Sequence, residues 1–278
     1  NISLNGSYNK NEVGNIPTSD GIIHGAGDEL YNNASEFYRA ENGQPIGYFW
    51  GYKTAGIFQN TQEIDEWRAA GNGILQSNVQ PGDVRFVDRN HDGQINDKDK
   101  VNLGNGTPDF TLGLNLGFVY KGFDFSIVAN GAFGQQIVQS YRNHTRPTPN
   151  YTTAILDRWH GEGTSNRIPR VTDSNINYQF SDLFIQNGDY LRLSTLTLGY
   201  DFAKLFKGKA VSQARLYFQV QNLFIITGYD GMDPEIGFGS SNNSWVSGLD
   251  YGYYPRPRTV LVLSLIHISE PTRPLYIS

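Results

Sequence analysis

The stretch FTLGLNLGFVY, residues 110–120, decides the fold class of this chain. Every second residue, beginning with Phe110 and ending with Tyr120, is large and apolar, whereas the residues between them are mostly small or polar. A period of two is that of a β-strand with one apolar and one polar face. Because the turn Lys121-Gly122 follows and the alternation resumes over residues 123–133, the sequence predicts one long hairpin.

The length of these strands favours a membrane over water as their surroundings. Strands of soluble proteins average about 5–6 residues. Ten steps of about 3.3 Å at a tilt near 40° rise roughly 25 Å, which is the height of the apolar band of an outer-membrane barrel. Phe110 and Tyr120 stand at the two ends of the apolar stripe, where such a barrel carries its aromatic girdles.

The rest of the chain repeats this organisation. Alternating segments also occur near residues 2–8, 190–202, 214–227 and from about Arg258 onward, which makes about six strands. Their connections alternate between short ones, 121–122 and 203–213, and long ones, 13–108, 134–189 and 228–257. Short turns on one side and long loops on the other are typical of outer-membrane barrels. We therefore predict an all-β fold: about six strands of a large antiparallel transmembrane β-barrel with long extracellular loops.

The composition excludes several classes of protein. The 278 residues include no Cys, so neither a disulfide scaffold nor a thiolate zinc site is available. The net charge of -5 and the lack of a Lys/Arg cluster argue against a nucleic-acid partner. No run of about 18 apolar residues is present that could form a spanning helix. The chain opens at Asn1 without a signal segment, so we expect a mature product or a fragment.

Two short helices are expected inside the long loops. The run Asn-Thr-Gln-Glu at residues 60–63 can act as a capping box for a helix through Trp67, which Gly71 would end. Residues 151–159 follow Pro149 and predict a second short helix.

The sharpest local motif is the stretch from Asp88 to Asp99. Its oxygen-bearing side chains fall at positions 1, 3, 5, 9 and 12, and Gly93 stands at position 6, which is the spacing of an EF-hand calcium loop. Position 7 would supply a backbone carbonyl, and Asp99 replaces the usual Glu, which shortens its reach. The candidate calcium ligands are Asp88, Asn90, Asp92, Gln94, Asn96 and Asp99. The ion would fold the loop, and the alternative is an Asx-rich turn held by its own hydrogen bonds.

Three carboxylates, Asp230, Asp233 and Glu235, lie within six positions of one another. One interpretation is the acid/base pair of a glycoside hydrolase. We favour a rigid turn, fixed by Gly231 and Pro234, and we predict no catalytic residue. No metalloprotease, nucleophile-elbow or Walker motif is present.

Aromatic residues in the presumed loops are candidates for substrate contact, because such rings stack on sugars or pack against ligand chains. The candidates are Tyr48, Trp50, Trp245 and Tyr253. The alternative is that these rings pack at the rim and stiffen the loops. On the strand near 214–227, the polar face would line a lumen with Arg215, Tyr217, Gln219 and Gln221.

Several short motifs occur together in a fixed order. They are GYFWGY (47–52), QPGDVRFVD (80–88), TPDF (107–110), AILDRW (154–159), YLRL (190–193), QNLF (221–224), YDGMDPE (229–235) and YPRPR (254–258). With these motifs, the chain resembles the C-terminal part of the SusC/RagA family of TonB-linked outer-membrane proteins, from residue 1 to about residue 262.

The resemblance implies a plugged barrel of roughly 22 strands in a bacterial outer membrane. Such proteins import nutrients, either oligosaccharides or peptides, and a SusD-like surface lipoprotein closes over their extracellular loops. The TonB complex supplies the energy. The plug, the TonB box and most strands lie outside this chain, so we expect it to represent only a part of such a transporter.

The end of the chain departs from the family pattern. Residues 263–273 read as a translated sequencing adapter, and residues 274–278 follow them. We therefore expect residues 1–262 to form the barrel part and residues 263–278 to be a non-native tail.

One alternative of another class remains besides the hydrolase: a secreted, calcium-stabilised β-sandwich that binds glycans. A sandwich would bury Leu112, Leu114 and Leu116 under a second sheet, whereas a barrel would turn them toward lipid.

Overall fold

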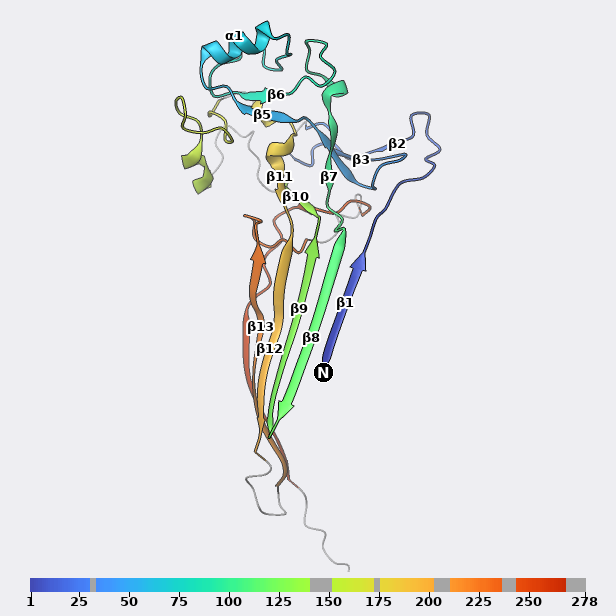
Figure 1. The fold of residues 1–278 in the computed structure, drawn as a ribbon, viewed down its shortest axis with the longest axis vertical. Helices are drawn as coiled ribbons and strands as arrows, with labels where there is room; N and C mark the ends of the chain where they lie inside the picture. Colours follow the sequence, from blue (N-terminus) through green and yellow to red (C-terminus); the bar gives the residue numbers. More distant parts are fainter. Residues whose placement is uncertain (31–33, 141–151, 173–175, 203–210, 237–243, 269–278) are drawn as a thin grey trace, which may run out of the picture.

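The chain folds into two parts that meet end to end (Figure 1). The computed structural model describes residues 1–30, 34–140, 152–172, 176–202, 211–236 and 244–268. One part is a tall sheet. The other part, which we call the loop lobe, consists of the described residues within the three long connections 13–108, 134–189 and 228–257.

The tall sheet has six antiparallel strands in the order β1-β8-β9-β12-β13-β15. Each strand lies beside the one that precedes it in this order along the chain, so the sheet is an up-and-down meander. The strands are β1 (Ile2–Tyr8), β8 (Phe110–Tyr120), β9 (Phe123–Phe133), β12 (Tyr190–Asp201), β13 (Val211–Thr227) and β15 (Thr259–Ile268). The predicted six strands are confirmed.

The predicted turn between β8 and β9 is also confirmed. Lys121 and Gly122 have φ angles of 49° and 92°. Two successive positive φ values give the tight turn whose twist matches that of the flanking strands. The turn places Tyr120 directly opposite Phe123 and thereby fixes the register of the whole hairpin.

The register sorts the side chains onto two faces. Leu114 of β8 lies in a row with Leu4 of β1, Ala129 of β9, Leu193 of β12 and Phe224 of β13. We call the face with this row the apolar face and the opposite face the polar face. Such rows continue across all six strands. The whole sheet therefore has one apolar face and one polar face.

No second sheet lies over the apolar face in the described part of the chain. The exposed fractions are 67% for Leu4, 57% for Phe118, 49% for Leu198 and 69% for Val262. A sandwich would bury these side chains against a facing sheet. The apolar face therefore fits hydrocarbon, as the barrel prediction requires, and not the core of a soluble sandwich.

A β-bulge interrupts β12 close to the loop lobe. The register shifts between Leu193 and Thr195 against both neighbouring strands, and Asn222 of β13 has a φ of 52°. Leu193 and Leu196 both lie on the apolar face although they are three positions apart. The bulge thus moves the alternation of β12 by one residue, as such insertions do.

The loop lobe contains three small sheets, with the orders β2-β3-β4-β7, β11-β10-β14 and β5-β6. The strands are β2 (Ile22–His24), β3 (Tyr38–Glu41), β4 (Tyr48–Gly51), β5 (Thr54–Ile57), β6 (Val84–Phe86), β7 (Val101–Asn105), β10 (Gln136–Gln139), β11 (Ile185–Asn187) and β14 (Leu249–Asp250). The helical elements are α1 (Thr61–Ala69) and the 3-10 helices η1 (Asp97–Asp99), η2 (Thr153–Asp157), η3 (Ile176–Tyr178) and η4 (Asp182–Phe184).

One hydrophobic core contains residues of all three connections. Phe37 and Phe49 come from the first connection, Val138 and Phe180 from the second, and Leu249 from the third, and all five are buried. Burying large apolar side chains is the main stabilising contribution to such a lobe. The connections are therefore parts of one folded body, which the sequence patterns do not predict.

Helix α1 begins as predicted. The Asn60 side chain accepts the N–H of Glu63 at 3.0 Å, and the Glu63 carboxylate accepts the N–H of Gln59 at 2.9 Å. Gly71, with a φ of 81°, follows the helix end. Of the second predicted helix, residues 153–157 form η2, and residue 151 lies outside the described residues. No helix in the described ranges is long and apolar enough to cross a membrane.

Strand β15 continues across the expected boundary at residue 262 and pairs with β13 as far as Ile268. Val260 and Val262 lie on the apolar face. Beyond them, Ser264 takes the apolar face, and Leu263 and Leu265 take the polar face. The native or foreign origin of residues 263–278 stays a prediction, and residues 269–278 lie outside the described residues.

Candidate functional site

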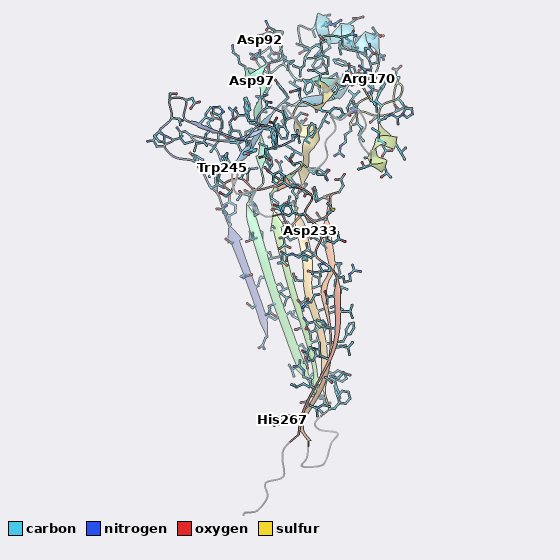
Figure 2. The ribbon with its side chains drawn as sticks, turned by 180° about the vertical axis from the view of Figure 1, so that it is seen from behind. Asp92, Asp97, Arg170, Asp233, Trp245 and His267 are labelled. Carbon is cyan, nitrogen blue, oxygen red and sulfur yellow. The ribbon has the colours of Figure 1, made fainter. Side chains whose placement is uncertain are left out.

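The Asp88–Asp99 loop lies between β6 and β7 at the end of the loop lobe that is farthest from the tall sheet (Figure 2, which labels Asp92 and Asp97). Its backbone has positive φ at His91 (57°) and Gly93 (79°). The Asp88 Oδ2 accepts the N–H of Gly93 at 2.8 Å. Gly93 therefore makes the sharp turn that was predicted for position 6.

Side-chain to backbone hydrogen bonds fold the interior of the loop. Asn90 Oδ1 accepts the N–H of Asp92 at 3.0 Å, and Asp92 Oδ1 accepts the N–H of Gln94 at 2.9 Å. Asn96 Oδ1 accepts the N–H of Lys98 at 3.0 Å. These are the Asx turns of the alternative interpretation, and they use oxygens that a calcium ion would also need.

The two ends of the loop carry buried carboxylates. Asp88 is 1% and Asp99 0% exposed. The Asp99 Oδ1 accepts the N–H of Arg89 and its Oδ2 that of Asn96, both at 2.8 Å, so position 12 lies against positions 2 and 9. Among the described residues, no group of three or more His, Cys, Asp and Glu side chains is arranged to hold a metal ion. Calcium binding stays a prediction.

Two candidate aromatic residues of strand β4 are engaged within the lobe. Tyr48 is buried, its hydroxyl donates a hydrogen bond to the Glu41 carboxylate, and burial raises its pKa. The guanidinium carbon of Arg39 lies 3.3 Å and the Lys100 Nζ 4.3 Å from the centre of the Trp50 ring. Such cation–π contacts hold Trp50 inside the lobe.

The third connection supplies the other two candidates. The Trp245 ring packs against Tyr38, with their centres 5.4 Å apart (Figure 2). Tyr253 is 39% exposed, and its neighbour Tyr254, which is not among the four candidates, is 87% exposed. Accessibility thus singles out Tyr253 and Tyr254 as rings that a ligand can reach, and contact with a substrate stays a prediction.

The carboxylates of the YDGMDPE motif form ion pairs at the junction of the lobe and the tall sheet, where Figure 2 labels Asp233. The Arg192 Nη2 lies 2.6 Å from the Asp233 Oδ1, and the Arg256 Nη2 lies 2.9 Å from the Glu235 Oε1. The Asp233 and Glu235 side chains are only 8% and 24% exposed, and arginine side chains occupy both carboxylates, which leaves neither of them free to meet a substrate. The arrangement fits a rigid turn and not a hydrolase pair.

Asp230, the remaining carboxylate of that motif, accepts a hydrogen bond from the Gln139 side chain at 2.6 Å. Neither Arg192 nor Arg256 was singled out as a partner of these carboxylates from the sequence. Both belong to motifs that carry the family resemblance, YLRL and YPRPR, and this was the sequence feature that could have pointed to them.

A buried polar network joins the first two connections. Asp83 is 1% exposed and accepts hydrogen bonds from the Arg170 Nε at 2.7 Å, the Asn177 Nδ2 at 2.8 Å and the backbone N–H of Gln80 at 2.9 Å. Figure 2 shows Arg170 on the side of the lobe. Gln80 belongs to the same turn as Asp83, whereas Arg170 and Asn177 come from the second connection, so Asp83 helps to fix how the two connections pack.

His24 lies between two carboxylates at the edge of the lobe. Its Nδ1 is 2.8 Å from the Glu36 Oε2, and its Nε2 is 3.3 Å from the Asp20 Oδ2. The hydrogen bond with Glu36, followed by that with Asp20, raises the pKa of His24 against the opposing effect of burial. Both ring nitrogens can donate to a carboxylate only in the protonated form.

The polar face of the tall sheet carries an ion pair that bridges two strands over a third. Asp124 of β9 pairs with Arg215 of β13, and the Arg215 Nε lies 3.1 Å from the Asp124 Oδ2. Gly199 of β12 lies between them, and a Cβ there would be 2.5 Å from the same oxygen. The absence of a side chain at Gly199 therefore makes the bridge possible.

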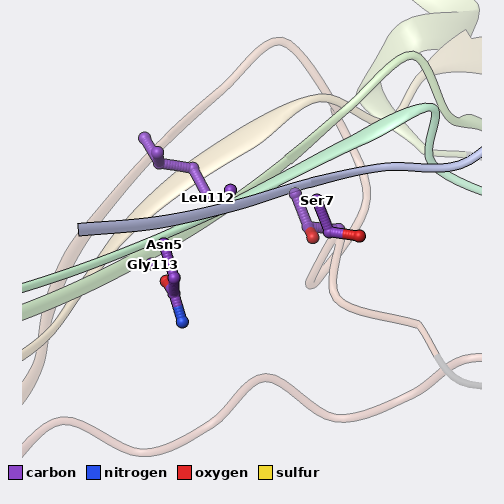
Figure 3. A pocket seen from close by; sticks show the side chains of 6 residues that line it. Asn5, Ser7, Leu112 and Gly113 are labelled. Carbon is purple, nitrogen blue, oxygen red and sulfur yellow. The ribbon is translucent and has the colours of Figure 1, made fainter.

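A shallow hollow lies between β1 and β8 (Figure 3). Its lining residues are Asn5, Gly6, Ser7, Thr111, Leu112 and Gly113. It contains no charged side chain and no acid/base group, so it does not form a catalytic site.

Comparisons with known proteins agree with this architecture. No family model matches the chain. The TonB-dependent receptor P3 of Formosa agariphila is 32% identical over 269 residues, which are 92% of this chain and 25% of that protein. The TonB-dependent receptor SusC of Bacteroides thetaiotaomicron is 28% identical over 263 residues, 94% of this chain and 24% of that protein.

Solved structures share the fold. The structure of the RagAB peptide transporter matches with a TM-score of 0.68 and 20% identity, and the match covers 96% of this chain and 27% of that chain. The RagAB peptide importer in its open-open state matches with a TM-score of 0.65 and 18% identity. The chain thus spans about a quarter of the length of the proteins it matches.

A meandering sheet with an uncovered apolar face and all its long connections at one end defines part of a transmembrane β-barrel of the bacterial outer membrane. Within that class, the relatives identify the chain as a SusC-like segment of a TonB-dependent receptor. The two outer strands of the tall sheet, β1 and β15, each have one unpaired edge in the described part of the chain. Lipid does not tolerate open strand edges, so these strands would pair with other strands of the complete barrel.

Proposed function

We propose that the receptor containing this segment imports nutrient molecules across the outer membrane with energy from the TonB complex. The observation that carries the proposal is the two-faced tall sheet, whose apolar face fits lipid and whose polar face fits a watery passage. The names of the relatives, which are receptors and not enzymes, support the same role. The paired state of Asp233 and Glu235 supports a protein without hydrolase activity.

The cargo that we propose is an oligosaccharide or a peptide. The motifs shared with the SusC/RagA family support this class, and so does the likeness in fold to RagAB, which is a peptide transporter. The exposed rings of Tyr253 and Tyr254 are surfaces on which either sugar faces or ligand side chains can pack.

A SusD-like surface lipoprotein is the proposed partner. The loop lobe supports this, because its shared core makes it a preformed platform. Flexible loops, in contrast, would first have to become ordered on binding, which costs free energy. The partner would close over this platform at the cell surface.

Uptake by the source bacterium tests the import function. We expect deletion of the receptor gene to abolish uptake of one labelled cargo class from a panel of oligosaccharides and peptides, and the intact gene to restore it. Undiminished uptake of every member of the panel by the deletion strain would contradict the proposal. The partner is tested by co-purification of the tagged receptor with the lipoprotein encoded beside it, and recovery of the receptor alone would contradict that part.

A further inference from the structure

We propose that the loop from Asp88 to Asp99 binds one calcium ion, which locks the outer end of the loop lobe around helix α1. The proposal concerns the stability of the lobe and does not depend on import. It stands on buried charge, on the closure of the loop and on a hydrogen-bonded path from the loop to Trp67.

The two buried carboxylates of the loop, Asp88 and Asp99, have no cationic side chain as a partner in the described part of the chain, whereas the exposed Asp97 pairs with Lys100. The Asp88 Oδ1 is buried and accepts no hydrogen bond from the described residues. Backbone N–H groups satisfy the Asp88 Oδ2 and both oxygens of Asp99, so within the described ranges the Asp88 Oδ1 is the oxygen left without a partner. A buried polar atom without a partner is costly, and a bound cation would remove that cost.

The loop is already closed in the way that a calcium loop requires. Asp99 at position 12 accepts the N–H of Arg89 at position 2, and Asp88 at position 1 accepts the N–H of Gly93 at position 6. The two ends and the central turn of the loop therefore lie together before an ion enters.

The ligand chemistry selects calcium. The available donors are carboxylate and amide oxygens and a backbone carbonyl, which calcium accepts in a flexible arrangement of six to eight oxygens. Asn90 and Asp92 would exchange their hydrogen bonds to backbone N–H groups for the ion. Because Asp99 is shorter than the usual Glu, we expect the affinity of an extracellular module, with a Kd of about 10⁻⁴–10⁻³ M.

Helix α1 is connected to the loop by two successive hydrogen bonds. The Gly73 N–H donates to the Asp88 Oδ2 at 3.2 Å, and the Trp67 indole N–H donates to the carbonyl of Gly73 at 3.2 Å. A Cβ at Gly73 would lie 2.8 Å from the carbonyl carbon of Gln94, so these segments touch through their backbones. An ion that pulls on Asp88 must therefore change the surroundings of Trp67.

The test is a calcium titration of the purified full-length receptor, free of its partner lipoprotein. Equilibrium dialysis measures the bound calcium, and tryptophan fluorescence measures the change around Trp67. Asp92→Asn removes a carboxylate ligand at an exposed position, and its amide oxygen can still accept the N–H of Gln94. Asp97→Asn removes an equal charge from the same loop at a position that is not a ligand, so it is the matched control. Trp67→Phe removes the reporter and leaves the ligands in place.

We expect saturable binding in the wild type, about tenfold or more weaker binding in Asp92→Asn, and a change of less than about twofold in Asp97→Asn. Trp67→Phe should lose the fluorescence change but retain the binding seen by dialysis. Three results would overturn the proposal: no saturation below about 10 mM calcium, an equal response to magnesium, or equal affinities of Asp92→Asn and Asp97→Asn. A fluorescence change that persists in Trp67→Phe would overturn the link to helix α1.

Discussion

Replacing Leu114 by Arg tests whether the apolar face meets hydrocarbon. The barrel assignment places residue 115, the midpoint of β8, at the bilayer midplane, and the neighbouring Leu114 would then lie within about 4 Å of it. An Arg on the lipid face costs about 2–4 kcal/mol at the midplane and about 0–1 kcal/mol near the interfaces. Phe110→Arg, at the end of the strand, should therefore cost much less than Leu114→Arg.

A cost of about 3 kcal/mol lowers the ratio of folded to unfolded receptor roughly 150-fold. The measurement is a urea titration of the full-length receptor in lipid vesicles, read as the fraction that migrates as the compact form on unheated gels. Asn115→Arg is the matched control, because it puts the same charge one residue away on the polar face. Equal destabilisation by Leu114→Arg and Asn115→Arg, or tolerance of Leu114→Arg, would refute the lipid assignment.

Three further predictions concern the loop lobe, and hydrogen exchange of its backbone amides measures each of them. Asn60→Ala should destabilise α1 by about 1 kcal/mol through loss of its cap, whereas Asn60→Ser should be nearly neutral; equal exchange in both variants would contradict this. Asp83→Ala should destabilise the lobe by about 3 kcal/mol, because it leaves Arg170 partly buried without its partner; unchanged protection would exclude that role. Because the pKa of His24 is raised on folding, its contacts stabilise the lobe fully below about pH 6.5 and lose this effect as the pH rises through the raised value. His24→Gln should remove that pH dependence, and a profile that persists in this variant would assign it to other groups.

The tall sheet was largely predictable because each strand carries its own signal. In β8 and β9 the alternation is unbroken and the turn residues are Lys121 and Gly122, so even the strand bounds could be predicted. In β12 the bulge beside Leu193 moves the alternation by one residue. The alternating pattern therefore predicts only the later half of this strand.

The loop lobe was not predictable because its core is formed by residues that are far apart in the sequence. Phe37, Phe180 and Leu249 meet only in three dimensions, and none belongs to a long periodic segment. The same reason explains the aromatic candidates: the sequence places Tyr48 and Tyr253 in loops, but only the packing makes Tyr48 buried and leaves Tyr253 accessible. The Asp88 loop was readable as a turn because Gly93 and the Asx side chains act locally.

The shared core also makes the folding of the three connections interdependent. Val246 and Leu249, which come from the last connection, are fully buried against residues from the first one. The lobe can therefore reach its final packing only when all three connections, and so nearly the whole segment, are present together. Until the last connection packs, the earlier connections expose apolar side chains, and such partly folded states are prone to aggregation and proteolysis. Substitutions at Val246 should consequently lower receptor abundance at the surface, although this residue lies remote from the lipid-facing strands.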